Sequence, residues 1–298
     1  MEVNIYQVDV FTHKPFGGNP AGIVPDARGL KDIDMQNIAK EMNISETVFI
    51  IPIDENNYEI RFFTPVSEVD LCGHGTIGAF YTLAYMGYIP SINNGIKKVY
   101  QNTKAGKLGV EIFFKNGEVE KVLMEQAKPQ ELNIIKDTNP LLECFNIKES
   151  DIGIGDEFIN PRIVSTGLPD ILLPLKEKNI LDNLNIDFKK LSILSKKLDV
   201  VGVHAFYLPR KNFDKVYTRN FAPLVGINEE AATGTSNGSL TYFLKKEGYI
   251  DRDEIVSLQG ESLNRPSYIY CKISKSNNDY MVKVGGQAKI VLEGIVCF

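Results

Sequence analysis

Two residues in the first third of the chain have side chains and surroundings suited to proton transfer. Glu46 lies two residues before an apolar run from Val48 to Ile51, where desolvation is expected to hold the proton affinity of its carboxyl group near the working pH. Its alternative role is helix capping, because Asn43 and Glu46 have the spacing of a capping box. The β-branched residues that follow favour a strand, and therefore the chemical role.

His74 lies between Gly73 and Gly75, directly before an apolar segment. A lone histidine is often just a satisfied polar side chain. At a helix N-terminus, however, it can donate a hydrogen bond to the anion that proton abstraction creates. His13 and His204 have no comparable surroundings, and we expect both to be structural.

The apolar segment after His74 predicts the helix that positions it. Residues 77–86 carry apolar side chains on every side of a helical wheel, which is typical of a helix enclosed by other structure. The free N–H groups and positive dipole end of this helix face the space in front of Gly73 and Gly75. That space suits a carboxylate or an enolate-like anion, so both glycines are candidate substrate-binding residues.

The same glycines allow a second interpretation, because Gly73, Gly75 and Gly78 match the Gly-x-Gly-x-x-Gly pattern of dinucleotide sites. That motif requires an acidic residue about 20 positions further on to bind the ribose. The chain has no Asp or Glu between Asp70 and Glu111. We therefore expect no nucleotide at this site.

Composition excludes several classes of protein. A formal net charge of −5 over 298 residues, with basic residues scattered among acidic ones, argues against a nucleic-acid surface. The start of the chain is not a signal sequence, and apolar runs are shorter than a membrane span, so we expect a cytoplasmic protein without a membrane partner. Four well-separated cysteines, and three histidines without metal-ligand spacing, predict reduced thiols and no metal.

An internal repeat indicates how the chain is organised. The similar stretches are 61–89 with 219–250, 19–24 with 168–173, and 32–42 with 187–198. Their nearly constant offset predicts two related α/β lobes that meet in the polar segment 126–140. Short strands and one apolar helix in each lobe indicate a curved sheet around a central helix. A cleft between the lobes, where the two glycine turns face each other, is the predicted site for a small-molecule substrate.

The second lobe contributes a related turn within residues 226–238. Backbone N–H groups and hydroxyls at Thr233, Gly234 and Thr235 are candidates for substrate binding, although an ordinary capped turn would have the same sequence. Glu230 is a candidate acid. The alternative is that Glu229 and Glu230 both lie in a solvated loop.

The repeat makes the two turns chemically unequal. When Gly78 is set on Gly238, with one residue inserted in the second helix, Cys72 aligns with Ala232. The same alignment sets Gly73 on Thr233 and Gly75 on Thr235. One lobe therefore has a thiol where the other has a methyl group.

Several segments, in order along nearly the whole chain, resemble the PhzF family, the isomerases of phenazine biosynthesis and their relatives. These segments are residues 8–22, 43–49, 69–76, 226–238, 257–267 and 284–288. The resemblance implies an α+β, diaminopimelate-epimerase-like fold of two pseudo-symmetric lobes, each a mixed β-barrel around a central α-helix, and a homodimer. We predict an N-terminal lobe of residues 1–126, completed by the tail 285–298, and a C-terminal lobe of residues 127–284.

The resemblance also implies cofactor-free proton transfer at carbon, which family members of known activity carry out on dihydro-hydroxyanthranilate. It assigns the family's acid/base glutamate to Glu46 and its histidine to His74. The family's second-lobe aspartate and serine correspond to Glu230 and Thr235, so Glu230 is predicted to be a polarising or proton-relay group. Asn19 and Pro20 are further candidates for substrate binding.

This chain departs from the family pattern at the second turn and near the C-terminus. Glu230, Ala231 and Thr235 replace the usual aspartate, proline and serine, and Asn264 replaces a frequent glycine. Glu230 reaches about 1 Å further than an aspartate, a shift that matters to a positioned acid. The fold is expected to persist, whereas the substrate is not identified by these residues.

Two alternative functions use the same fold. Racemases and epimerases of this fold use two facing cysteines, whereas Cys72 aligns with Ala232, so we expect Cys72 to be a small buried residue. The other alternative is a non-catalytic interaction protein. We therefore predict a cofactor-independent isomerase in which one base, Glu46, moves a proton on a small carboxylate-bearing substrate.

Overall fold

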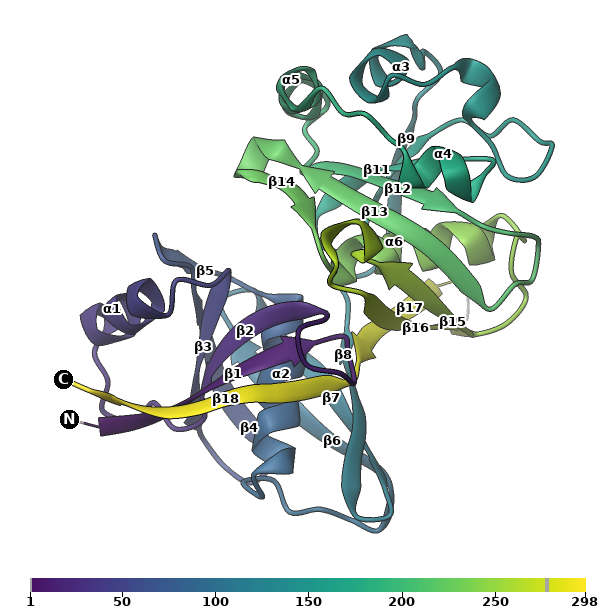
Figure 1. Cartoon of the computed structure of the whole chain (residues 1–298). Coiled ribbons are helices and arrows are strands. Elements are labelled where there is room, and N and C mark those ends of the chain that lie inside the picture. The colour runs from purple at the N-terminus through teal and green to yellow at the C-terminus, as the bar shows by residue number, and fades with distance from the viewer. Residues whose placement is uncertain (1, 277–278) are drawn as a thin grey trace. The chain divides into compact units, whose positions relative to one another are not determined.

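The computed structural model of the chain describes residues 2–276 and 279–298. The chain forms two compact units, of which unit 1 comprises Met1–Glu125 and Gly285–Phe298 and unit 2 comprises Gln126–Val284 (Figure 1). The end of the chain thus returns to unit 1, where β18 (Ala288–Cys297) pairs antiparallel with β1 (Glu2–Val10). The predicted mixture of strands and helices is confirmed, and the sheets are its dominant part.

Unit 1 is built on a mixed sheet. Its strands pair in the order β18–β1–β2–β3–β4–β6–β7–β8, and the short β5 lies beside β4. The further elements of this unit are β2 (Asn19–Val24), α1 (Asp32–Met42), β3 (Glu46–Pro52), β4 (Asn57–Phe63), β5 (Glu68–Val69), α2 (Gly73–Tyr85), β6 (Asn94–Thr103), β7 (Gly106–Lys115) and β8 (Glu118–Glu125).

Unit 2 has the pairing order β9–β10–β11–β12–β13–β15–β16, with β14 beside β13. Its strands are β9 (Gln130–Ile134), β10 (Arg162–Ser165), β11 (Pro169–Pro174), β12 (Gly202–Tyr207), β13 (Lys215–Ala222), β14 (Ile227–Glu230), β15 (Glu254–Gln259), β16 (Ser267–Ser276) and β17 (Asp279–Gly286). Its helices are α3 (Asn139–Phe145), α4 (Lys178–Asp182), α5 (Phe188–Leu198) and α6 (Gly234–Lys246), with single 3₁₀ turns at Glu149–Asp151, Pro223–Val225 and Glu261–Leu263.

The two units repeat one strand pattern. The run β1–β2–β3–β4–β6–β7 and the run β10–β11–β12–β13–β15–β16 both alternate antiparallel and parallel pairs in the same order. In each run one long helix, α2 or α6, precedes the fifth strand. The strand that follows α1 in unit 1 is therefore equivalent to the strand that follows α5 in unit 2, so β3 is the counterpart of β12.

Helix α2 is enclosed by the sheet of unit 1. Every residue from His74 to Ala84 is buried, and the helix contacts β1, β2, β3, β7, β8 and β18. A Cβ atom at Gly75 would lie 2.9 Å from Val48 Cγ2 and 3.2 Å from Phe62 Cδ1. Because the backbone of Gly75 is already helical, glycine is needed there for close packing of the helix on β3 and β4, and not for a tight turn.

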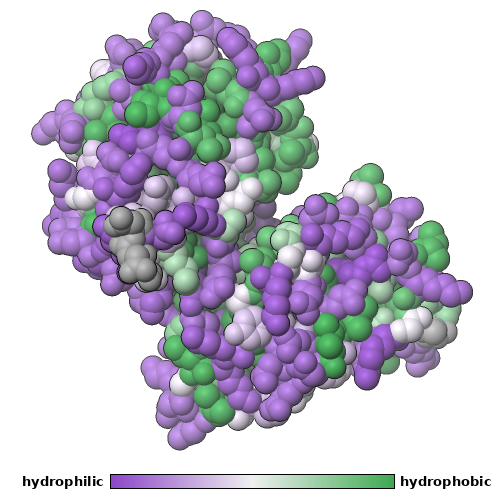
Figure 2. Space-filling model, turned by 180° about the vertical axis from the view of Figure 1, so that it is seen from behind, coloured by the Kyte–Doolittle hydropathy of each residue, from purple (hydrophilic) through white to green (hydrophobic). Residues whose placement is uncertain are grey.

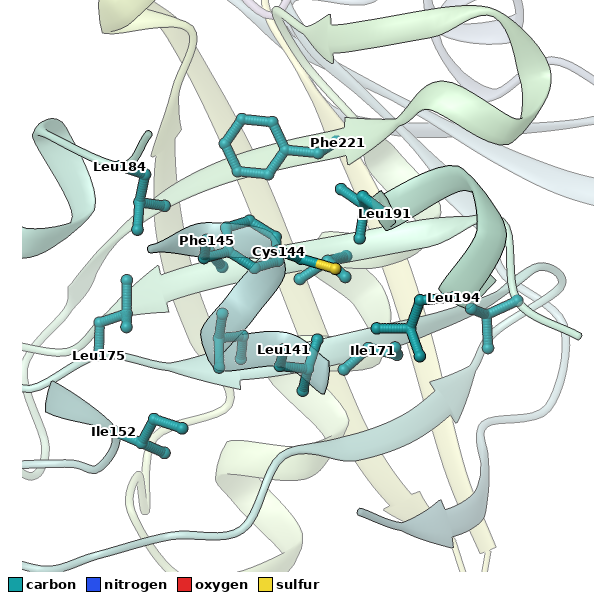
Figure 3. Close-up of a cluster of buried hydrophobic side chains, with 14 of the residues drawn as sticks. Leu141, Cys144, Phe145, Ile152, Ile171, Leu175, Leu184, Leu191, Leu194 and Phe221 are labelled. Atoms are coloured by element: carbon teal, nitrogen blue, oxygen red, sulfur yellow. The ribbon is translucent and has the colours of Figure 1, made fainter. Parts of the chain in front are cut away.

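Helices α3 and α5 cover the sheet of unit 2 through a hydrophobic cluster (Figure 3). Side chains of α3 and α5 pack on strand residues in this cluster, which includes Leu141, Phe145, Leu191, Leu194, Ile171 and Phe221. Burying one such side chain contributes about 2 kcal/mol. In unit 1, α1 packs in the same way, with Met35 and Ile38 against Phe49.

The surface in Figure 2 has hydrophobic side chains interspersed with hydrophilic ones on both units. Among the residues that the structure describes, we find no helix with the length and apolar character needed to cross a membrane.

Candidate active site

Glu46 is the first residue of β3, and the local sequence explains its position. Asn43 ends α1 in the left-handed conformation, with φ of 48°, so the chain leaves the helix and enters the strand through Ile44 and Ser45. Glu46 then pairs with Ala21 of β2, and its side chain is 19% exposed. The predicted strand is confirmed, and the capping-box alternative for Asn43 and Glu46 is wrong.

His74 is the second residue of α2 and faces Glu46. Its Nε2 atom lies 3.0 Å from Oε2 of Glu46, and its side chain is only 7% exposed. The Nδ2 atom of Asn19 lies 3.5 Å from Nδ1 of the same ring. Three of the predicted residues, which are far apart in sequence, therefore meet in unit 1.

Cys72 is a member of this cluster that sequence reasoning treated only as a small buried residue. It precedes α2, and its Sγ atom accepts a hydrogen bond of 3.3 Å from the backbone N–H of Gly75. Sγ also lies 3.4 Å from Nδ1 and 3.9 Å from Nε2 of His74. The thiol therefore lies against the imidazole. In the sequence, the position of Cys72 directly before the predicted helix could have indicated this contact.

Electrostatics make the Glu46–His74 pair ionic. Burial acts to raise the pKa of Glu46, but the positive charge of His74 outweighs it, so the pKa lies below its usual value. Burial acts to lower the pKa of His74, but Cys72 and Glu46 outweigh it and raise the pKa well above its usual value. Burial raises the pKa of the Cys72 thiol. The expectation that desolvation dominates at Glu46 is therefore wrong, because the histidine lies in contact with its carboxylate.

One carboxylate oxygen of Glu46 retains hydrogen-bonding capacity that the described residues do not use. Although Oε2 is within ion-pair distance of His74, it is a buried oxygen for which the described residues supply no well-aligned hydrogen bond. A Cβ atom added at Gly73 would meet no other atom within 4 Å. There is therefore open space at the start of α2 beside an acid–base pair.

A metal ion is the other ligand these side chains could hold. Ligand atoms of Glu46, Cys72 and His74 lie within 4.8 Å of one another. Metal ligation would release a proton from the thiol and from the imidazolium, and the pKa of each is raised in this cluster, so a metal would have to displace both protons and break the Glu46–His74 ion pair. The electrostatics of the donor set fit proton transfer better than metal binding.

The remaining unit 1 candidates lie close in sequence to this cluster. Pro20 lies next to Asn19 in β2, opposite Asp9 of β1, and Gly73 and Gly75 flank His74 in the first turn of α2. Unit 2 has no room for a second Glu46, because its equivalent is Gly202, where a Cβ atom would lie 2.0 Å from the Phe221 carbonyl oxygen. An acid at this position is therefore possible in unit 1 alone.

The unit 2 candidates gather at the start of α6. Glu230 ends β14, and its Oε2 accepts a 2.8 Å hydrogen bond from Oγ1 of Thr233. Gly234 and Thr235 form the first turn of the helix, and the carbonyl oxygen of Thr235 accepts a 2.8 Å bond from Thr166. The structure thus brings Glu230 and Thr233 into direct contact.

Glu229 has a different role from its neighbour. Both of its carboxylate oxygens accept hydrogen bonds of 2.8 Å from the Arg219 guanidinium, and its side chain is 11% exposed. Arg61 and Glu68 form a similar pair in unit 1. The solvated-loop alternative for Glu229 is wrong, since the residue anchors the segment before α6.

The helix bounds correct the sequence alignment of the two turns. Both helices have 13 residues, and each is followed by a glycine with positive φ at the same distance, Gly87 and Gly248. The inserted residue that the alignment assumed is therefore not needed. Cys72 corresponds to Thr233, the residue before each helix, and not to Ala232. Neither Thr233 nor Ala232 is a cysteine, so unit 2 has no thiol that corresponds to Cys72 under either alignment.

A surface pocket of about 320 Å³ lies elsewhere in unit 2. Lys178, Arg219 and Glu261 are among its lining residues, and the predicted site residues are not. Its charged groups pair with one another or with near neighbours, as Lys178 does with Glu261. The pocket therefore offers no unpaired charge on these three groups to a ligand.

Comparison with known proteins gives consistent results. The model of the phenazine biosynthesis-like protein family matches residues 8–294. An uncharacterized isomerase of Clostridium acetobutylicum is 35% identical, over 97% of this chain and 96% of that protein. The trans-2,3-dihydro-3-hydroxyanthranilate isomerase of Pseudomonas fluorescens is 31% identical over 90% of each chain. The crystal structure of a PhzF-family phenazine biosynthesis protein of Bacillus anthracis has a TM-score of 0.86, 27% identity and complete coverage of both chains.

Proposed function

Because the chain belongs to the family of phenazine biosynthesis-like (PhzF) proteins and is an isomerase like its named relatives, we propose that it moves a proton between carbon atoms of a small carboxylate-bearing substrate without a cofactor. The observation that carries this proposal is the contact between Glu46 and His74 at the start of α2, 3.0 Å between Oε2 and Nε2. A buried carboxylate against an imidazolium supplies a base and a stabiliser of negative charge in one place.

In the proposed reaction, the Glu46 carboxylate takes a proton from a substrate carbon. The electron pair of the broken C–H bond moves into the conjugated system of the substrate and gives an enolate-like anion. His74 and the first N–H groups of α2 stabilise the new charge. Glu46, whose captured proton exchanges with solvent, then delivers a proton to a second carbon on the same face, and the carboxylate is regenerated.

The other predicted residues enter as proposals of the same kind. We assign a polarising or proton-relay role to Glu230, and substrate binding to residues in both units: Asn19, Pro20, Gly73, Gly75, Thr233, Gly234 and Thr235. Glu230, Ala231 and Thr235 differ from the usual family residues, which favours a substrate different from that of the Pseudomonas fluorescens relative. A diaminopimelate-epimerase-like pair of barrels, a homodimer and a cytoplasmic location complete the proposal.

An amino-acid epimerase is the nearest alternative, and it would need a second thiol. Thr233 occupies the position equivalent to Cys72, and a threonine hydroxyl is too weak an acid to replace a thiol as the second base. A non-catalytic interaction protein is the other alternative. A buried Glu46–His74 ion pair, next in sequence to the open space at Gly73, favours the enzyme over both.

The test is substrate-dependent uptake of solvent deuterium. The protein is incubated in D₂O with trans-2,3-dihydro-3-hydroxyanthranilate and with a panel of small unsaturated carboxylic acids, and the products are analysed by mass spectrometry. We expect uptake by the wild type with at least one compound and its loss in Glu46→Gln. Uptake with no compound, or equal uptake by the variant, would refute the proposal.

A further inference from the structure

Gln259, the last residue of β15, is a buried amide with 1% exposure that holds the turn before α6. Its Nε2 atom donates hydrogen bonds to the carbonyl oxygen of Glu230 at 2.8 Å and to Oγ1 of Thr233 at 3.1 Å. Its Oε1 atom accepts from the backbone N–H of Thr233 at 3.2 Å and from Nδ2 of Asn237 at 2.9 Å. A glutamine amide has two N–H donors and two acceptor lone pairs, so Gln259 uses its full capacity here.

Donor and acceptor roles can be assigned to the hydrogen bonds that connect Asn220, His204 and Asn237 to Gln259. Nδ2 of Asn220, a donor, lies 3.3 Å from Nδ1 of His204, so Nδ1 accepts and Nε2 carries the proton. Nε2 lies 3.1 Å from Oδ1 of Asn237, which leaves Nδ2 of Asn237 to donate to Gln259. Burial lowers the pKa of His204 to about 4, which keeps this neutral form at neutral pH.

The chain of bonds ends on the carboxylate of Glu230. Because Gln259 donates to Oγ1 of Thr233, the threonine hydroxyl directs its own proton to Oε2 of Glu230, 2.8 Å away. A hydrogen bond donated to a carboxylate favours its ionised form. The sequence from His204 through Asn237 and Gln259 thus orients Glu230 and supports its charge.

Unit 1 contains the matching amide without this arrangement. Gln101 of β6 is fully buried, and it contacts Thr76, the fourth residue of α2, as Gln259 contacts Asn237, the fourth residue of α6. Its Oε1 accepts from Oγ1 of Thr76 at 3.0 Å, but its Nε2 has no hydrogen-bond partner within the described part of the chain. Holding the turn before the helix is therefore a property of the glutamine in unit 2.

We propose that Gln259 is a positioning residue, which acts through Thr233 to hold the Glu230 carboxylate oriented for proton transfer. This inference rests on the proposed function, in which Glu230 takes part in the reaction. It gives a role to a residue in the segment 257–267, which carried a family resemblance but no chemical assignment.

A double-mutant cycle tests the inference in the full-length protein. Wild type, Gln259→Met, Glu230→Gln and the double variant are compared for kcat and KM in the deuterium-uptake assay, with the compound that the wild type turns over among the dihydro-hydroxyanthranilate and acid panel. Since misplacing a catalytic group by 1 Å can cost about 100-fold, we expect Gln259→Met to lower kcat at least about 10-fold with little change in KM. In the Glu230→Gln background the same change should cost less than about 2-fold.

Controls separate positioning from folding. Gln101→Met removes an equally buried strand glutamine and should lower kcat less than about 3-fold. Should Gln259→Met fail to fold, Gln259→Asn, which keeps a buried amide but shortens its reach, must show the same dependence on Glu230. Equal losses in both backgrounds, or no loss, would refute the inference alone. No uptake by the wild type would refute the proposed function and the inference together.

Discussion

Glu46 is the residue whose replacement tests the site most directly, because shortening and neutralising it have different expected costs. Glu46→Asp withdraws the carboxylate by one methylene, which lengthens the contact with His74 Nε2 from 3.0 Å to about 4.5 Å. With an effective dielectric constant of about 20, the attraction between unit charges falls from about 5.5 to about 3.7 kcal/mol. The loss of about 2 kcal/mol weakens the ion pair, and it is not a rate factor by itself because Glu46 gives up its charge in the proton-transfer transition state.

Misplacement adds to this electrostatic loss. A base drawn back by more than 1 Å from the substrate carbon costs up to about 100-fold, so we expect Glu46→Asp to lower kcat about 100-fold and keep measurable deuterium uptake. Glu46→Gln removes the base itself and should lower kcat about 1,000-fold or more, within the range of general acid–base catalysis.

The assay is deuterium uptake at several substrate concentrations, with folding checked by circular dichroism and urea unfolding. Glu118→Gln is the matched control, because Glu118 also begins a strand of unit 1 but is exposed, and it should keep wild-type kcat. The reasoning would be refuted by a Glu46→Gln variant with more than one tenth of wild-type kcat. It would also be refuted by a similar loss in the Glu118 control.

Three further predictions concern the stability of the protein, the pH dependence of that stability and the effect of a chelator. His74→Leu leaves the Glu46 carboxylate without its cation and should lower the free energy of unfolding by about 3 kcal/mol at pH 7, measured in urea. Burial raises the pKa of Asp170 from 3.8 to about 6, so its stabilising effect is present below pH 3.8 and lost as the pH rises to about 6. Burial lowers the pKa of His204 from 6.5 to about 4, so its effect is present above pH 6.5 and lost as the pH falls to about 4. The two dependences oppose each other, so between pH 6.5 and pH 4 the free energy of unfolding of Asp170→Asn should fall by about 2 kcal/mol more than that of the wild type, measured in urea. An identical pH dependence would contradict this. Dialysis against a chelator should leave deuterium uptake unchanged, and a loss that zinc restores would contradict the acid–base assignment.

Local sequence patterns predicted much of the fold. The helix expected over residues 32–42 has these bounds as α1, because its apolar spacing and its end at Asn43 are local properties. The strand expected from Glu46 and the buried helix after His74 were also confirmed. The helix starts at Gly73, earlier than the apolar run, because a helix N-terminus is defined by backbone geometry and glycine has little preference of its own.

Contacts between distant segments were beyond these patterns. The segment 257–267 carried only a family resemblance, since the four hydrogen bonds of Gln259 go to residues more than twenty positions away. The alignment of Cys72 with Ala232 failed because similar glycines, Gly78 and Gly238, were matched in place of the helix starts.

From the sequence alone, the kinds of chemical group and the elements that carry them were determined: an acid at the start of a strand, a histidine at the start of a buried helix, and a repeat of this helix without a second thiol. Only the tertiary structure decided the ionisation of these groups. The pKa of Glu46 depends on competition between burial and the His74 ring 3.0 Å away, and such competition is resolved by distances between strand and helix that neither segment encodes by itself.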